Sequence, residues 1–297
     1  IEYSCLFSII IPCHNDVPGL SSCLNAIFVQ EGRVEFEVIV VDDGSDTDIG
    51  EELSTEFPKV IFERLGGQSG PARARNRGIS LSHGQYLVFI DSDAVPNPSW
   101  LLSMTAEFYL GSEIICGPVR HTSGIFARLT ALTAFGEYQE TLDGYRKHCP
   151  SVNYAVSSKI MNSFSYDETI PFAGEDVILS TQFTSAGYTI RYLASAWVLH
   201  NPSLSCKRYF RRAFAYGIGF KFSRARCPDL AGYFFHKYLR AASAIILFFI
   251  RIILDFNRLI KLRQELALRF VELPVFAAGI ILTRVVYATG VVWGYFV

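Results

Sequence analysis

The chain has 297 residues, which allows one large α/β domain or one domain with an appendage, and half of the residues are hydrophobic, enough for a sizeable core. The formal net charge of −1 argues against a nucleic-acid partner attracted by bulk charge, although local basic patches can exist. The seven cysteines form no CxxC pair, which indicates reduced core residues of an intracellular protein and excludes a disulfide framework or a zinc site.

Short apolar runs alternate with helical patterns along the first two-thirds of the chain. The N-terminal "IEYSCLFSIIIP" lacks the basic start of a signal peptide and is interpreted as leading into a first strand. The predicted strands cover residues 7–12, 36–45, 60–65 and 85–94. The predicted helices cover residues 20–29, 48–57, with Asp48 as the N-cap, and 70–83. This alternation predicts βαβ units and a parallel sheet covered on both faces.

Polar residues follow the last apolar residue of three predicted strands, in "PCHND", "VDDGSDT" and "IDSDA". In open parallel sheets, ligands bind beyond the carboxyl ends of the strands. Asp91 and Asp93 flank one serine, and residues two apart on a strand share a face, so their charges would repel. This spacing makes sense if a positive group lies between them or if the strand has already ended. Mg²⁺ or Mn²⁺ could bridge them to a phosphate, and a solvated turn is the alternative.

Five motifs occur in a fixed order: "IIIPCHND", "VDDGSDT", "GPARARNRGI", "FIDSDA" and "GEDVILSTQFTSAGYTIRYL". Together they resemble the GT-A glycosyltransferases of family 2, a group of inverting enzymes that use nucleotide-sugars. The resemblance covers roughly residues 5–220. It implies a GT-A fold of the α/β class, Rossmann-like with a mostly parallel central sheet, followed here by C-terminal hydrophobic or amphipathic helices. The alternating pattern by itself indicates only a parallel α/β sheet with a polar carboxyl edge.

The resemblance also implies a donor-binding set. Asp43 matches the residue that accepts a hydrogen bond from the uracil N–H, which favours UDP, although guanine and thymine offer similar donors. Turn formation is the alternative for Asp42 and Asp43. Two arginines in "RRAFAYG" match positions that reach the donor diphosphate or the acceptor. The donor-binding candidates are Pro12, Asn15, Asp43, Arg75, Asn76, Asp91, Asn153, Arg211 and Arg212.

Metal and catalytic roles follow from the same motifs. Asp93 matches the main ligand of a Mn²⁺ or Mg²⁺ ion, with Asp91 beside it and His200 as a third metal-facing residue. A polar strand-end residue is the alternative for His200. Asp176 matches the base that deprotonates the acceptor, and Glu175 supports it. The helix dipole is expected to hold the pKa of Asp176 low, and the alternative is that both acids serve only that dipole.

The composition changes after residue 200. We predict a GT-A domain over 1–204, a basic aromatic amphipathic connector over 205–230 and a hydrophobic, membrane-associating helical region over 231–297. Arg251 and Arg284 interrupt the apolar runs, so neither run reaches the roughly 18 uncharged residues of a simple membrane span.

In-plane or re-entrant helices on the cytoplasmic leaflet are therefore preferred, with the catalytic domain on the cytoplasmic side. Two spans, an oligomer interface, or a helical cap on the catalytic domain are the alternatives. Between the apolar runs, we expect Phe256, Leu259, Ile260, Leu266 and Phe270 to share one helix face.

The sequence thus predicts a metal-dependent, inverting, membrane-associated glycosyltransferase of polysaccharide biosynthesis. Its acceptor would be a hydroxyl or phosphate of a lipid-linked glycan or a polyprenyl phosphate. A non-catalytic nucleotide-sugar-binding or assembly protein on the same fold is the alternative. The presence of all three motif aspartates, Asp43, Asp93 and Asp176, argues against it. A nucleotidyltransferase would carry a glycine-rich basic signature near its N-terminus, and "IIIPCHNDVPGL" is not one. A homo-oligomer is left open.

Overall fold

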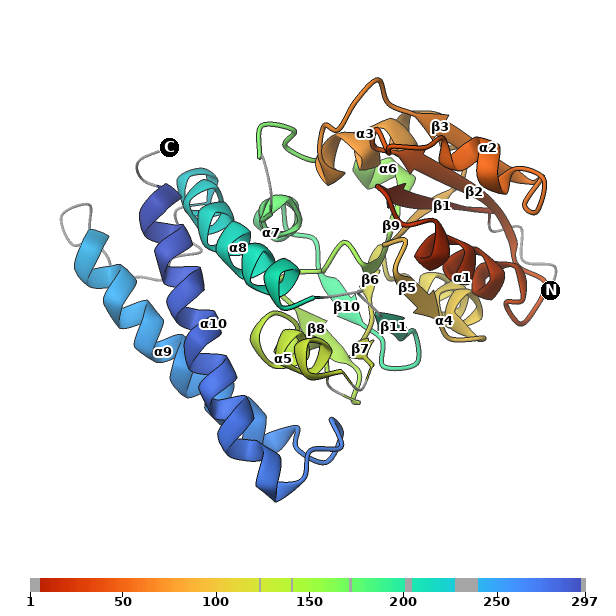
Figure 1. Cartoon of the computed structure of the whole chain (residues 1–297). Coiled ribbons are helices and arrows are strands. Elements are labelled where there is room, and N and C mark those ends of the chain that lie inside the picture. The colour runs from red at the N-terminus through yellow and green to blue at the C-terminus, as the bar shows by residue number, and fades with distance from the viewer. Residues whose placement is uncertain are drawn as a thin grey trace. The chain divides into compact units, whose positions relative to one another are not determined.

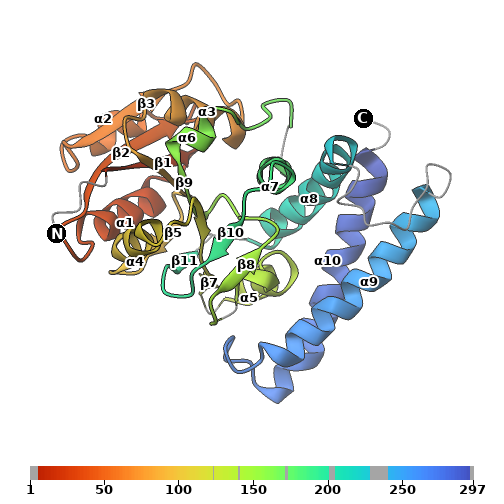
Figure 2. The same cartoon turned by 180° about the vertical axis from the view of Figure 1, so that it is seen from behind.

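The computed structural model describes residues 6–122, 124–139, 141–170, 173–200, 205–227 and 240–294. The chain forms two compact units (Figures 1 and 2). The first consists of Ile1–Arg120, Glu140–Thr169 and Glu175–Asn201, and the second of His121–Gln139, Ile170–Gly174 and Pro202–Val297. The second unit thus takes in two segments from within the predicted 1–204 domain. The predicted boundary between connector and helical region, at 230/231, lies outside the described residues.

The first unit is built on a mixed sheet with the strand order β3-β2-β1-β4-β9-β6-β10-β8. Strands β3, β2, β1 and β4 are mutually parallel, and β6 is parallel to β10, whereas β9 and β8 run against their neighbours. This confirms the predicted α/β class with a mostly parallel central sheet. The strand bounds are β1 (Leu6–Cys13), β2 (Glu35–Asp42), β3 (Val60–Arg64), β4 (Tyr86–Ile90), β6 (Ile114–Cys116), β8 (Gly144–Arg146), β9 (Asn153–Ser157) and β10 (Ile190–Tyr192).

A smaller sheet of three strands has the order β5-β11-β7. Strand β5 follows β4 almost directly, and the antiparallel pairing of β5 with β11 sets His200 opposite Ala94. The bounds are β5 (Ala94–Pro96), β7 (Val119–His121) and β11 (Val198–His200). This small sheet therefore brings a residue from the end of the first unit next to the end of β4.

Helices cover the large sheet on both sides, with α1 and α3 on opposite sides of β1 (Figure 1). The Asp16 side chain caps α1 by accepting a hydrogen bond from the Gly19 amide at 3.2 Å, so α1 begins at Val17, earlier than predicted. Asp48 caps α2, as predicted. The helices are α1 (Val17–Phe28), α2 (Ile49–Leu53), α3 (Pro71–Leu81), α4 (Trp100–Tyr109), α6 (Ser158–Met161) and α7 (Glu175–Ser185).

Close packing fixes α3 on the sheet. Ile9, Ile10 and Ile11 of β1 are all fully buried, as expected of a strand covered on both faces. A Cβ atom at Gly78 of α3 would clash with the side chain of Ile10, so glycine allows the helix to approach β1. The helix that carries Arg75 is therefore held firmly against the middle of the sheet.

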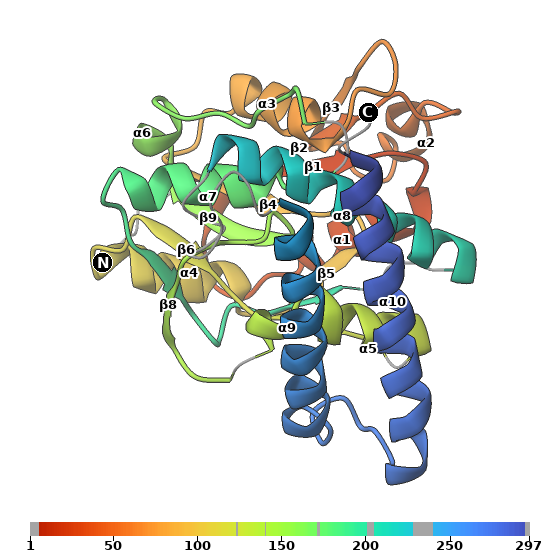
Figure 3. The ribbon, with the colours of Figure 1, turned by 90° about the vertical axis from the view of Figure 1, so that its left-hand side faces the viewer.

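The second unit is helical among its described residues. Helices α8 and α10 approach each other at glycines, because a Cβ atom on Gly217 would clash with the Tyr287 carbonyl and one on Gly290 with the Phe214 carbonyl. Helices α9 and α10 lie side by side (Figure 3). The elements are α5 (Ile125–Thr133), η1 (Gly136–Tyr138), α8 (Cys206–Arg226), α9 (Arg240–Lys261), η3 (Phe270–Glu272) and α10 (Leu273–Gly294).

The interior of this unit contains an ion pair. Arg284 Nε lies 2.6 Å from Asp255 Oδ2, and Arg284 Nη2 donates a hydrogen bond to the Thr133 carbonyl at 2.7 Å. Both charged side chains are buried. Arg284 therefore does not interrupt the apolar outer face of α10, because its side chain points into the unit. Among the described residues, Phe270–Gly294 is a helix long and apolar enough to cross a membrane.

The predicted amphipathic face over 256–270 is only partly correct. Leu259 and Leu266 are buried in the core of the second unit, whereas Ile260 is 66% and Phe270 71% exposed. The reason is that α9 ends at Lys261 and the chain then turns, so a single helical period does not continue to residue 270.

Candidate functional site

Loops that follow β1 and β2 are joined to each other at the carboxyl edge of the sheet. His14 Nδ1 lies 2.9 Å from the carbonyl oxygen of Asp43. The Asn15 amide donates to Ser45 Oγ at 2.8 Å, and Asn15 adopts a left-handed backbone conformation with φ of 53°. Pro12 stands just before this turn, half-buried near the end of β1. These candidates for nucleotide binding therefore belong to one connected loop region.

Asp43 organises the glycine-rich turn before α3. Its two carboxylate oxygens accept hydrogen bonds from the Ser69 amide at 2.7 Å and the Gly70 amide at 2.8 Å. Gly70 has a φ of 94°, which favours glycine at this position. Each carboxylate oxygen has a further lone pair that can accept a hydrogen bond from a nucleobase. The contact of Asp43 with a nucleobase remains a prediction. Asp42 accepts a hydrogen bond from the Ser45 amide at 2.8 Å, which stabilises the turn after β2.

Asp91, Asp93 and His200 form a cluster whose ligand atoms all lie within 4.8 Å of one another. Strand β4 ends at Ile90, and the two aspartates lie in the turn before β5, so the strand has ended where the carboxylates begin. His200 Nε2 lies 3.1 Å from Asp93 Oδ1. His200 is buried, and the carboxylates are about a quarter exposed, at 27% for Asp91 and 25% for Asp93. Carboxylate oxygens with an imidazole nitrogen fit Mn²⁺ or Mg²⁺.

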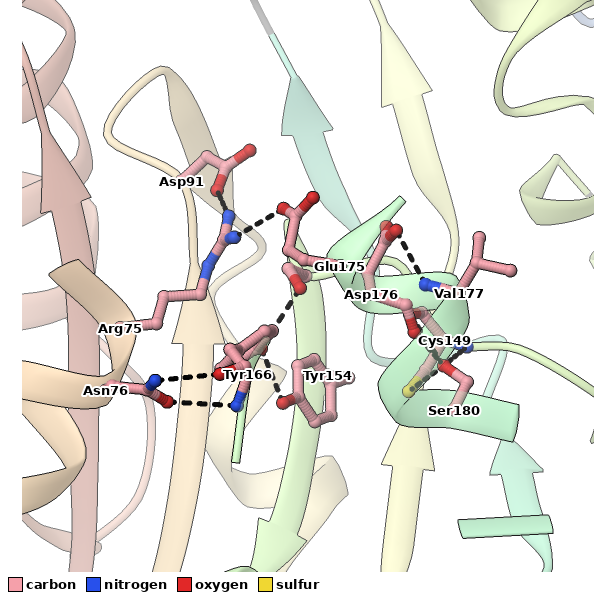
Figure 4. A network of polar contacts seen from close by, with 11 residues as sticks. Arg75, Asn76, Asp91, Cys149, Tyr154, Tyr166, Glu175, Asp176, Val177 and Ser180 are labelled. Atoms are coloured by element: carbon pink, nitrogen blue, oxygen red, sulfur yellow. Dashed lines mark hydrogen bonds and ion pairs between the residues drawn. The ribbon is translucent and has the colours of Figure 1, made fainter. Parts of the chain in front are cut away.

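A positive group also contacts this turn. The Arg75 guanidinium, 5% exposed, donates from Nη2 to Asp91 Oδ1 at 2.8 Å and from Nη1 to Glu175 Oε1 at 2.9 Å (Figure 4). Both explanations considered for the two aspartates therefore hold in part, since the strand has ended and a cation lies against Asp91.

Glu175 and Asp176 open helix α7, as predicted. Burial, together with the neighbouring Asp176, raises the pKa of Glu175 to about 7, and Arg75 limits the shift. Burial also raises the pKa of Asp176, against the effect of Arg75 and of the Val177 amide, which donates to Asp176 Oδ1 at 2.8 Å. The expectation of a low pKa for Asp176 is therefore wrong, because the cost of burying the charge exceeds the effect of the helix dipole.

Two of the three candidate asparagines, Asn76 and Asn153, bind other parts of the protein. Asn76 Oδ1 accepts from the Tyr166 amide at 3.0 Å, and Asn76 Nδ2 donates to the Tyr166 carbonyl at 2.9 Å. Asn153 is fully buried, with Oδ1 accepting from Trp100 Nε1 at 2.9 Å and Nδ2 donating to the carbonyls of Pro118 and Ala196. Because these partners use its amide and leave no exposed surface, we correct the predicted donor contact of Asn153 to a structural role.

Arg211 and Arg212 lie on α8 in the second unit. Arg211 is exposed, and Arg212 Nε donates a hydrogen bond to the Tyr216 hydroxyl at 2.7 Å. Their predicted contact with the donor diphosphate remains a prediction.

Sequence reasoning did not identify the surroundings of Arg75. The Tyr166 ring centroid lies 5.5 Å from Arg75 Cζ, and the Tyr166 hydroxyl lies 2.6 Å from that of Tyr154 and 3.0 Å from Ser151 Oγ. Arg75 and Glu175 are 100 residues apart, so no local pattern could have paired them.

Known proteins that are similar to this chain are glycosyltransferases. The sequence model of the family described as Glycosyl transferase family 2 matches residues 8–170. Glycosyltransferase AglE of Haloferax volcanii is 27% identical over 220 residues, which cover 71% of this chain and 72% of that protein. The pre-mycofactocin glycosyltransferase of Mycobacterium tuberculosis is 26% identical over 240 residues, 75% of this chain and 48% of that protein. The chain thus spans about half the length of the second relative.

Solved structures share the fold. Mannosyltransferase PcManGT from Pyrobaculum calidifontis, in complex with GDP-Man and Mn²⁺, superposes with a TM-score of 0.63 at 14% identity, over 98% of this chain and 88% of that chain. Residues 1–349 of TarS from S. aureus, in complex with UDP, superpose with a TM-score of 0.54 at 17% identity, over 96% of this chain and 90% of that chain. At these identities the likeness shows the fold.

Proposed function

The chain belongs to glycosyl transferase family 2 and transfers sugar from a nucleotide-sugar, and we propose that it does so in one metal-dependent, inverting displacement. One observation carries this proposal. The cluster of Asp91, Asp93 and His200 and the acids that open α7 lie in the same unit. The Arg75 guanidinium joins them, because it donates hydrogen bonds to both Asp91 and Glu175. A site for the leaving diphosphate and a site for the attacking acceptor are thereby connected through one side chain.

The charge balance supports a divalent ion at the cluster. The carboxylates of Asp91, Asp93 and Asp176 carry more negative charge than the guanidinium of Arg75 balances, even where Glu175 holds a proton. A Mn²⁺ or Mg²⁺ ion held by Asp91, Asp93 and His200 would supply positive charge to the diphosphate as it leaves. The solved structure of PcManGT, which contains Mn²⁺, supports the choice of metal.

Asp176 is proposed as the base. It takes the proton of the acceptor hydroxyl while the acceptor oxygen bonds to the anomeric carbon and the bond from that carbon to the diphosphate oxygen breaks. Burial raises the pKa of Asp176, which makes its carboxylate a stronger proton acceptor than an exposed aspartate. Attack from the side opposite the diphosphate inverts the sugar.

The nucleobase of the sugar donor is proposed to be uracil. Asp43 lies in the loop after β2 with its carboxylate fixed by two backbone amides, and an imide N–H would complement a free lone pair there. Guanine carries a similar N–H, and the solved structures of this fold hold GDP-Man in one case and UDP in another. Binding measurements must therefore separate UDP from GDP.

The acceptor is proposed to be a lipid-linked glycan or polyprenyl phosphate at the cytoplasmic leaflet. From residue 248 onward, the exposed faces of α9 and α10 are largely apolar, while the polar pair Asp255 and Arg284 points inward. Lys261 and Arg269 are exposed beside the turn between the two helices, where they would meet anionic headgroups. Helices in the plane of the leaflet fit this distribution. The exposed apolar residues are Phe249, Ile250, Ile253, Leu254, Val275, Leu282, Val285, Val292 and Trp293.

The test is calorimetric binding of UDP, GDP, CDP, ADP and dTDP to the detergent-solubilised protein, first with Mn²⁺ and then with EDTA. We expect UDP to bind only with metal, and Asp93→Ala to abolish this binding while the variant stays folded by circular dichroism. If GDP binds tightly and UDP does not, the nucleobase of the donor is guanine and the proposal of uracil is wrong. No binding of any diphosphate to the folded parent would support the non-catalytic alternative.

A further inference from the structure

Arg75 is buried between two carboxylates of different function. We propose that Arg75 is a positioning residue, which fixes metal-holding Asp91 and base-supporting Glu175 relative to each other, and not a residue that binds the donor. The roles of the two carboxylates rest on the proposed function. The bridging role itself rests on the contacts of the guanidinium.

The geometry of the guanidinium makes it suited to this task. Its two terminal nitrogens donate in different directions, Nη2 to Asp91 in the turn after β4 and Nη1 to Glu175 at the start of α7. The group is planar, so the angle between these two hydrogen bonds is fixed. The positions of the two carboxylates therefore depend on each other through one rigid side chain.

Arg75 is itself held in place. The neighbouring residue on α3, Asn76, binds both the amide and the carbonyl of Tyr166, and the Tyr166 ring lies against the guanidinium. The Tyr166 hydroxyl is bonded in turn to that of Tyr154 on β9 (Figure 4). Because α3, the Tyr166 segment and β9 are tied together in this way, Arg75 cannot follow a moving carboxylate, and instead keeps it in place.

Burial argues against direct donor contact. The guanidinium is 5% exposed, and Nη1 and Nη2 both already bind carboxylates. Asp91 Oδ1 bonds to Arg75, and a metal ion can take the other oxygen of the same carboxylate. Arg75 would therefore act on the metal by orienting Asp91, as hydrogen-bonding partners of metal ligands commonly do.

The experiment compares Arg75→Met, Arg75→Lys and Glu175→Leu with Arg77→Met. Arg77 lies on the same helix but forms an exposed pair with Glu63 at 2.8 Å, so it is the matched control. Mn²⁺ binding without donor is measured by electron paramagnetic resonance of the free ion. UDP binding at saturating Mn²⁺ is measured by calorimetry, and kcat by sugar transfer.

We expect Arg75→Met to weaken Mn²⁺ binding by about 10- to 100-fold, the usual effect of losing a partner of a metal ligand. It should lower kcat as well, while UDP affinity at saturating Mn²⁺ stays near that of the parent. Arg75→Lys should recover part of the Mn²⁺ affinity, since it restores the charge without the second hydrogen bond. Arg77→Met should match the parent in all three measurements.

Glu175→Leu gives a second route if Arg75→Met does not fold, because leucine removes the acceptor of the Arg75 Nη1 hydrogen bond. This variant should weaken Mn²⁺ binding although Glu175 is not a metal ligand, and its effect on kcat should not multiply with that of Arg75→Lys, because the two residues act through one contact. If Arg75→Lys and Glu175→Leu both bind Mn²⁺ as the parent does, the inference is wrong. The same holds if loss of Arg75 weakens only UDP binding. Failure of the proposed function is recognised separately, by a parent that binds no diphosphate with Mn²⁺.

Discussion

Glu175 should make the metal-free protein less stable as the pH rises from about 4.5 to about 7. Burial raises the pKa of this carboxyl from 4.5 to about 7, so between these values the folded chain holds a proton that the unfolded chain has released. Stability from this group is complete below pH 4.5 and is lost as the pH passes through 7. The difference of about 2.5 pKa units corresponds to about 3 kcal/mol at 1.36 kcal/mol per unit. The charged groups next to Glu175 are Asp176, which increases the shift, and Arg75, which limits it.

The assay is urea unfolding of the parent and of Glu175→Gln in EDTA from pH 4.5 to 8, followed by circular dichroism. Glutamine imitates the neutral acid, so other titrating groups cancel in the difference between the two proteins. The parent should lose about 3 kcal/mol relative to the variant across this range. A difference that stays constant, or a parent that gains stability relative to the variant as the pH rises, would refute the assignment of a buried, neutral Glu175.

Three further outcomes are expected. Asp176→Asn should lower kcat by roughly 10²- to 10⁴-fold with UDP affinity near that of the parent, measured by sugar transfer and calorimetry, and transfer at the parental rate would remove Asp176 as the base. Arg284→Met should destabilise the protein by about 3–5 kcal/mol because Asp255 stays buried without its closest partner, and Arg284→Met with Asp255→Leu should recover most of the loss in thermal unfolding. Leu282→Glu, on the outer face of α10, should weaken co-sedimentation with anionic phospholipid vesicles by about tenfold or more. Leu110→Glu, at an exposed leucine of the first unit, is the control and should have no effect. Equal binding by both variants would contradict membrane attachment through α10.

Local features of the sequence predicted the parts of the fold that local physics determines. The apolar run of β1 and the N-cap at Asp48 were both predicted, because each depends on a few neighbouring residues. The proximity of Asp93 to His200 was expected from a resemblance, and the structure gives its physical basis in the pairing of β5 with β11. No rule of spacing would have brought together two residues so far apart in the chain.

The sequence alone could not show which polar side chains are buried. Asn153 occupies a motif position associated with the donor sugar, yet its amide joins Trp100 to two backbone carbonyls and is fully enclosed. Likewise, the inward direction of Arg284 follows from Asp255, which lies on a different helix, at 2.6 Å. A helical pattern gives the spacing of side chains around an axis, but the side of the axis that meets the core depends on which elements pack against it.

The pKa of Asp176 shows why this matters for chemistry. A carboxylate at a helix start gains only about 0.3–1 kcal/mol from the dipole, whereas each pKa unit is worth about 1.4 kcal/mol, so burial of modest extent is enough to reverse the sign of the shift. The charge of Arg75 limits that reversal, because it lowers the pKa of both Glu175 and Asp176. An exposed aspartate at this position would be ionised but weakly basic. One whose pKa is raised by burial accepts a proton more readily from the acceptor as the bond to the sugar forms.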